Sequence, residues 1–201
     1  RFGLNSSLGF SAGLKTNTNL LFELEGTFMF SQNVKEDILK PLKNSDGQVI
    51  NVSGQYANIL IQERGFTETF NIGKIFPIIG PNPNSGLLVK IGIGTIHHKI
   101  RIENQNNLVP ELNKEKLPYY DRLTFGFLIK QYIGYYHLSS KRMQNFNAGI
   151  EFYQGFTRGM RDFQIDLMAP YLEKRLDLLF GVRVGWLVPV YRKSNKDFYF
   201  D

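Results

Sequence analysis

The C-terminal part of the chain alternates strictly between apolar positions and polar or small ones. Every second residue from Leu176 to Tyr191 is apolar, over a length of sixteen residues. Successive side chains of a strand point to opposite faces, so this segment is predicted to form a strand with one continuous apolar face. Strands of globular proteins have roughly five or six residues, whereas a tilted strand that crosses a bilayer needs about nine to eleven. The pattern therefore predicts a membrane-spanning strand.

The same two-residue period occurs in six earlier segments, which gives seven predicted strands. The six segments are residues 2–14, 20–31, 56–76, 87–94, 123–130 and 146–152. In each segment the apolar face is rich in Phe, Leu and Ile. We expect these faces to contact lipid, as the outer face of a transmembrane barrel does. The residues expected to face lipid are Phe10, Phe28, Ile91, Phe127, Phe152, Phe180, Val184 and Trp186.

The opposite faces of the same strands carry glycines and charged residues. Glycine weakens a strand, so its repeated use implies that large side chains approach closely from across a narrow space. The interior of a barrel of about eight strands is just wide enough to be filled by side chains. We therefore predict a structural network of ion pairs in the lumen, because buried charges persist only when they are paired. Its predicted members are Glu23, Glu25, Lys90, Lys130, Glu151, Asp177 and Arg183. The alternative is a sheet of a soluble protein, in which these charges would meet water.

Short and long connections alternate along the chain. Residues 15–19, 77–85 and 137–142 form tight turns rich in Thr, Asn, Pro and Ser, and residues 31–55, 102–121 and 157–175 form longer loops. Outer-membrane barrels place short turns in the periplasm and long loops outside the cell, which predicts a periplasmic C-terminus. Tyrosines near the strand ends (Tyr119 and Tyr120 outside; Tyr135, Tyr136 and Tyr191 inside) are expected to form the two interfacial girdles.

Seven strands is an odd number, whereas single-chain bacterial barrels have an even number. We expect that a first strand and a signal peptide are missing upstream of Arg1. Alternatively, residues 163–167 could form the eighth strand. This alternative breaks the alternation of short and long connections, so we expect these residues to extend a hairpin above the membrane.

Composition changes this interpretation little. The 201 residues are 42% hydrophobic and contain no cysteine, which suits one domain spanning residues 1–201. A mean hydropathy of −0.23 resembles that of a soluble protein, but alternation averages out the apolar signal of a barrel. The chain has no apolar run of about eighteen residues and therefore no predicted transmembrane helix. The net charge of +6 comes from scattered basic residues, so nucleic-acid binding is not expected.

The sequence gives no indication of catalysis. The three histidines are His97, His98 and His137, and the first two point to opposite faces of a strand. His137 lies near Ser139 and Ser140, a common arrangement that does not define a nucleophile. No spaced cluster of His, Cys and Asp suits zinc. We expect a protein that is not an enzyme and has no metal and no cofactor.

The whole chain resembles the small bacterial outer-membrane β-barrels of the eight-stranded OmpA/OmpX-like class. The resemblance is carried by the glycine-rich strands (Gly9 to Gly13 and Gly92 to Gly94), the closing strand and the aromatic tail Phe198 to Phe200. It implies an all-β, antiparallel up-and-down transmembrane barrel in the outer membrane of a Gram-negative bacterium. The implied partners are outer-membrane lipid, lipopolysaccharide and other outer-membrane proteins.

Fold alone does not define activity. The favoured function is a non-catalytic structural or accessory subunit of an outer-membrane complex for secretion, assembly or uptake. The alternatives are a small pore or lipid-modifying enzyme and, third, a soluble lipocalin-like carrier. A carrier would need its Phe-rich face turned inward and its charges in water.

Overall fold

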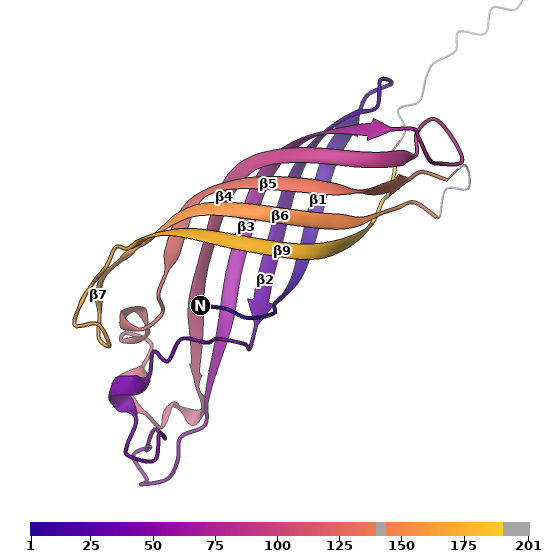
Figure 1. Ribbon diagram of the computed structural model, residues 1–201. Helices are drawn as coiled ribbons and strands as arrows, with labels where there is room; N and C mark the ends of the chain where they lie inside the picture. The colour runs from indigo at the N-terminus through magenta and orange to yellow at the C-terminus, as the bar shows by residue number, and fades with distance from the viewer. Residues whose placement is uncertain (140–143, 191–201) are drawn as a thin grey trace, which may run out of the picture.

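The structure is a computed structural model that describes residues 1–139 and 144–190, and it consists mainly of one seven-stranded antiparallel sheet (Figure 1). Each strand pairs with its neighbour in the up-and-down order β1-β2-β3-β4-β5-β6-β9. The strands are β1 Ser6–Lys15, β2 Leu20–Ser31, β3 Ile59–Phe76, β4 Gly86–Asn104, β5 Thr124–His137, β6 Phe146–Gly159 and β9 Lys174–Trp186. The fold of the described residues is therefore all-β.

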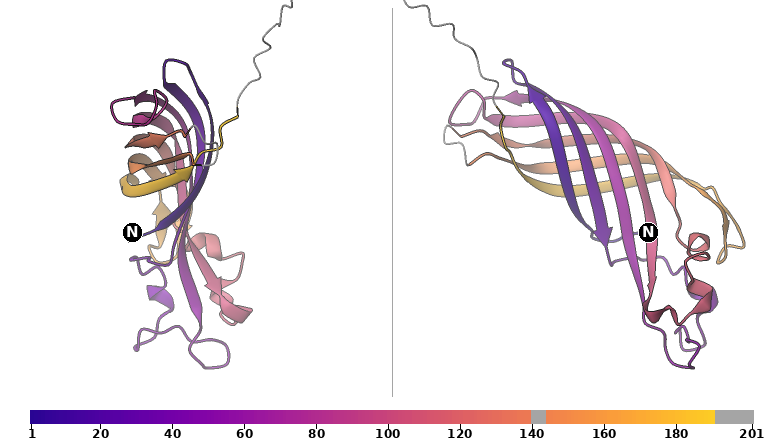
Figure 2. Two further views of the ribbon diagram at one scale, coloured as in Figure 1. Left: turned by 90° about the vertical axis from the view of Figure 1, so that its right-hand side faces the viewer. Right: turned by 180° about the vertical axis from the view of Figure 1, so that it is seen from behind.

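The sheet is strongly twisted and curled, and it is not closed (Figure 2). Its two edges are β1 and β9, which do not pair with each other. Adjacent strands are antiparallel throughout, so the first and seventh strands run in the same direction. The closed transmembrane barrel that the sequence predicts is thus not seen, although the strand order and pairing agree with it.

The predicted strands are present, but several of their ends differ. β9 ends at Trp186, so Val188 and Val190 do not belong to it. Pro189 lacks the N–H that a continuing ladder would require. Tyr191 and the aromatic tail lie outside the described residues. β4 continues ten residues beyond the predicted end at residue 94, to Asn104.

The long connections pack together at one end of the sheet, and we call residues 32–58, 105–123 and 160–173 the loop cap. The cap contains four 3₁₀ helices: η1 Lys40–Leu42, η2 Gln105–Asn107, η3 Pro110–Leu112 and η4 Leu117–Tyr119. β7 Arg161–Gln164 and β8 Ala169–Tyr171 form a separate hairpin, as expected for residues 163–167. In the described part of the chain, no helix has the length and apolar character needed to cross a membrane.

The cap has its own apolar core, which continues onto the inward side of β4. Its buried residues are Ile38, Leu39, Val49, Ile100, Ile102, Val109, Leu112 and Tyr120. Two further apolar clusters lie between the strands: Leu21, Ile75, Leu88, Tyr132 and Tyr136, and then Met29, Ile96, Leu128 and Tyr153. Tyr120 and Tyr136 are buried in these clusters, so the prediction that they belong to exposed girdles is wrong.

Candidate functional site: a buried charge network

Charged residues are buried on the inward face of the sheet, and apolar residues are exposed on its outward face. Lys130 on β5 is only 1% exposed, and Glu25 on β2 is 5% exposed. On the outward face, Phe10 is 73% exposed and Val184 is 76% exposed. This distribution is the reverse of the ordinary rule that apolar side chains are buried and charges meet water.

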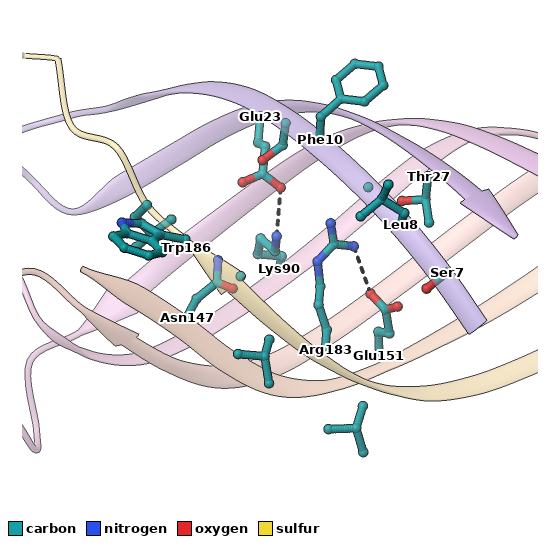
Figure 3. A pocket seen from close by; sticks show the side chains of 16 residues that line it. Ser7, Leu8, Phe10, Glu23, Thr27, Lys90, Asn147, Glu151, Arg183 and Trp186 are labelled. Carbon is teal, nitrogen blue, oxygen red and sulfur yellow. Dashed lines mark hydrogen bonds and ion pairs between the residues drawn. The ribbon is translucent and has the colours of Figure 1, made fainter. Parts of the chain in front are cut away.

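Six of the seven residues predicted for the network come together. Lys130 lies 2.5 Å from Glu25 and 3.2 Å from Glu151. Arg183 reaches the same two carboxylates, at 2.5 Å from Glu25 and 3.2 Å from Glu151. The dashed contact between Arg183 and Glu151 is visible in Figure 3. Residues from β2, β5, β6 and β9 are thereby joined across the interior.

Lys90 of β4 joins the network from the other side. Its ammonium lies 2.7 Å from Glu23 and 3.9 Å from Glu25 (Figure 3). The network then contains three carboxylates and three cations, so its formal charge is balanced. Balance matters because each unpaired buried ion costs several kcal/mol of desolvation free energy.

Neutral neighbours complete the network, and the sequence did not reveal them. The Thr27 hydroxyl donates to Glu25 at 3.1 Å. The Lys90 ammonium lies 4.7 Å from the ring centre of Tyr132, and the Lys130 ammonium lies 5.0 Å from that of Tyr153. Both tyrosines lie just beyond the predicted ends of their strands, at residues 130 and 152, and extending the alternation by one or two residues would have placed them on the inward face.

Asp177 does not join the other six residues. It forms a second cluster with His98, whose Nε2 lies 2.9 Å from the carboxylate, and with Thr157, whose hydroxyl donates to it at 2.6 Å. The Arg175 guanidinium lies 3.5 Å away. Asp177 is separated from Arg183 by six residues of the same strand, so the inward face holds two charge clusters instead of one.

The residues predicted to face lipid all lie on the outward face. Seven of them are exposed, namely Phe10, Phe28, Ile91, Phe127, Phe180, Val184 and Trp186. Phe152 is half-buried between its neighbours. The sequence analysis did not single out Glu68, which is exposed on this face, with its carboxylate 3.4 Å from the Thr95 hydroxyl.

A cavity of about 380 Å³ lies at the gap between the two edge strands and opens onto the charge network. Ser7, Gly9 and Ser11 line it from β1, and Arg183 and Gly185 line it from β9. Ser7 and Arg183 are labelled in Figure 3. Arg183 extends across the gap, because a Cβ atom added to Gly9 would lie 3.0 Å from its guanidinium nitrogen. Glycine on β1 therefore leaves room for this arginine.

The loop cap contains an ionic cluster of its own. The Glu36 carboxylate lies 2.8 Å from the Arg1 guanidinium and 3.2 Å from the Arg122 guanidinium. Arg122 also forms an ion pair with Asp166. Burial would raise the pKa of Glu36, but the Arg1 and Arg122 guanidiniums outweigh burial and hold the pKa below its ordinary value. Arg161 donates two hydrogen bonds to Asp121. These bonds raise the pKa of Arg161 and keep it protonated.

The histidines lie as their alternation predicts, with His97 outward and His98 inward. Over residues 1–139 and 144–190, no three His, Asp or Glu side chains are grouped closely enough to hold a metal ion. No protein-family model, curated protein or solved structure matches the chain.

Proposed function

We propose that this chain forms the wall of a transmembrane β-barrel in a bacterial outer membrane, of the small OmpA/OmpX-like class. In this proposal it acts as a non-catalytic structural or accessory subunit of an outer-membrane complex. The observation that carries the proposal is the combination of buried, balanced charges on the inward face with exposed Phe, Leu, Ile and Val on the outward face. A soluble carrier needs the opposite arrangement.

The polarity of β4 inverts along its length, which supports a membrane boundary near Thr95. Between Leu87 and Ile93 the outward side chains are apolar and exposed, and the inward face carries Lys90. Beyond Thr95 the outward positions are polar (His97, Lys99 and Arg101), and the inward positions are three buried isoleucines (Ile96, Ile100 and Ile102) and His98, which contacts Asp177. The second half thus follows the rule for a strand in water, and the first half follows the rule for a strand in lipid.

The open edges support closure by one additional strand. β1 and β9 run in the same direction, so a single strand running oppositely would pair antiparallel with both. Closure would satisfy the free N–H and C=O groups of both edges, which have no water to bind inside a bilayer. Closure would also separate the charge network, which includes Arg183, from lipid.

The filled interior favours a structural role over a pore. The charge network lies between the two apolar clusters of the inward face, and Tyr132 and Tyr153 contact it from these clusters. Large side chains therefore occupy successive levels of the interior. The loop cap adds a further packed layer at one end.

The only tryptophan of the chain, Trp186, provides the direct test. It is 74% exposed on the outward face at the turn end of β9. After reconstitution of the protein into phospholipid vesicles, its emission should shift to the blue and be quenched by lipids brominated in the acyl chains. Aqueous iodide should quench it little. Emission that stays red and is quenched by iodide alone contradicts membrane insertion.

Membrane insertion and the accessory role are separate claims. Unheated samples of an intact barrel should migrate differently from heated samples on a denaturing gel. An accessory subunit should in addition co-purify with outer-membrane proteins extracted in mild detergent. Insertion without a stoichiometric partner contradicts the accessory role and leaves the barrel proposal in place.

A further inference from the structure

Two pairs of cations oppose each other on the outward face, at the loop-cap end of the sheet. Arg64 of β3 is the register partner of Lys99 of β4, and Arg158 of β6 is the register partner of Lys174 of β9. Lys99, Arg158 and Lys174 are exposed, and Arg64 is half-buried. Like charges directly opposite each other destabilise a sheet. The arrangement therefore calls for negative charge from outside the sheet.

The described part of the chain does not supply that negative charge. The Arg64 guanidinium donates to neutral acceptors, the Glu63 carbonyl oxygen at 2.9 Å and the Gln62 side-chain oxygen. On the same outward face, Glu68 lies four residues from Arg64 and contacts Thr95, while Glu103 is paired with Arg101 at 2.5 Å. In residues 1–139 and 144–190, Lys99, Arg158 and Lys174 have no carboxylate within ion-pair distance.

The turn end of the sheet lacks such pairs among the described residues. Lys15 lies opposite Leu21, and Lys74 lies between Leu20 and Val89. Both lysines already have partners in the turns: Lys15 donates to Asn84 at 2.7 Å, and Lys74 donates to the Thr18 carbonyl oxygen at 2.6 Å. Among the described residues, directly opposed cations on the outward face therefore occur only at the loop-cap end.

Apolar side chains adjoin the cations on the side of the exposed band. Phe125 of β5 is the register partner of Arg158, and Leu176 lies two residues from Lys174 on the same face; both are exposed. Lys99 lies just beyond the point where the polarity of β4 inverts. A ligand that satisfies this surface has an anionic group at the cations and hydrocarbon beside it, in contact with Phe125 and Leu176.

We propose that Arg64, Lys99, Arg158 and Lys174 form a cation belt that binds the phosphate groups of anionic lipid headgroups. This inference rests on the proposed function, because it places the belt at the membrane surface. Phosphate oxygens accept hydrogen bonds from Arg and Lys, and two cations facing each other can share one phosphate. The belt then holds lipid at the loop-cap end only, which also fixes the orientation of the chain in the bilayer.

The test measures binding of diphosphorylated lipid A and of the same lipid with its phosphates removed, by native mass spectrometry of the full chain in a non-ionic detergent. We expect clear preference for the phosphorylated lipid. The double substitution R158Q and K174Q should weaken that binding about 25-fold, since each cation near a membrane surface contributes about fivefold. The matched control, K15Q with K74Q, removes the same charge at the turn end, where neither lysine faces a second cation that could share a phosphate, and should change binding less than about twofold.

Three outcomes would overturn the inference. These are equal binding of the dephosphorylated lipid, an equal loss in the turn-end control, and complete displacement of the lipid by millimolar inorganic phosphate, which would identify a site for free phosphate. Heat-dependent gel migration is recorded on the same samples. If migration shows a barrel and lipid preference is absent, only the cation belt fails. If migration shows no barrel in the unsubstituted chain, the proposed function fails as well.

Discussion

At the scale of a single residue, a substitution of Val184 tests whether the outward face of the sheet contacts lipid. Its side chain is exposed and its neighbours Arg183 and Gly185 point inward. In a barrel, Val184→Arg should lower the free energy of unfolding by about 2–4 kcal/mol, because the arginine would lie in hydrocarbon. Urea unfolding of the protein refolded into phospholipid vesicles, followed by Trp186 emission, measures the change.

Gly181 is the matched control on the inward face of the same strand. A Cβ atom added there has no neighbour closer than 3.8 Å, the Glu151 Cγ. Gly181→Ser should therefore change stability by less than about 1 kcal/mol. A cost equal to that of Val184→Arg would contradict the inside-out assignment.

Glu25 is the carboxylate that the most cations contact in the network. Lys130 and Arg183 each lie 2.5 Å from it. Glu25→Gln should cost about 3–5 kcal/mol of unfolding free energy, because it leaves Lys90, Lys130 and Arg183 each with one fewer anionic partner. Glu68→Gln makes the same chemical change on the neighbouring strand at an unpaired, exposed position, and it should be neutral or slightly stabilising. Similar costs for both variants in vesicle-based urea unfolding would contradict a role for the network in stability.

At the scale of elements, β3 and β4 leave no room for a side chain at Gly94. A Cβ atom at this position would lie 1.8 Å from the backbone oxygen of Glu68. Gly94→Ala should therefore push the two strands apart and lower the free energy of unfolding by about 1–3 kcal/mol. Gly181→Ala, where space is open, is the control in the same unfolding experiment. Equal stability of the two variants would show that the close approach is dispensable.

The loop cap should loosen in acid. The lowered pKa of Glu36 means that its pairing with Arg1 and Arg122 contributes full stability above the unfolded pKa of about 4.3. The contribution is lost as the pH falls through the lower folded pKa. Hydrogen exchange of residues 32–58, corrected for intrinsic rates, should show loss of protection in that range. Glu36→Gln should remove this pH dependence, and an unchanged profile in that variant would contradict the assignment.

The sequence predicted the strands in which apolar and polar residues alternate regularly. It did not predict the part of β4 in which the polarity of the outward face changes. The outward and inward positions of β2, β5 and β6 agree with the predicted faces within residues 20–31, 123–130 and 146–152. The second half of β4 was missed because its apolar residues, Ile96, Ile100 and Ile102, move to the inward face under the loop cap. A search for one constant polarity cannot find a strand whose outward face changes from apolar to polar along its length.

The sequence predicted which charged residues face inward, but it did not predict which of them contact one another. Alternation shows which face a charged residue occupies, and that was sufficient for Glu25, Lys130 and Arg183. The grouping depends on the register between strands that are far apart in the sequence, such as β2 and β9. Asp177 was assigned to the wrong cluster for this reason, since its height along β9 places it beside His98.

At the scale of the whole molecule, the large side chains in the interior predict a protein that does not conduct ions. The apolar clusters that contain Leu88 and Leu128 lie on either side of the charge network and should obstruct the passage of ions. Reconstitution into a planar bilayer should give no ion conductance above the baseline of protein-free membranes. Stable, stepwise openings in the purified protein would instead favour the small pore.

The strands differ in length, so the sheet extends further at the loop-cap end than the shorter strands do. β3 has 18 residues and β4 has 19, whereas β1 has 10. At about 3.4 Å per residue, β4 is about 60 Å long, while a strand inclined at about 45° needs only about 42 Å to traverse a 30 Å hydrocarbon layer. In the proposed barrel, the surplus of about 20 Å would form a two-stranded stalk that carries the loop cap away from the bilayer. A molecule that approaches such a barrel from that side would contact the loop cap and the stalk before it reaches the lipid.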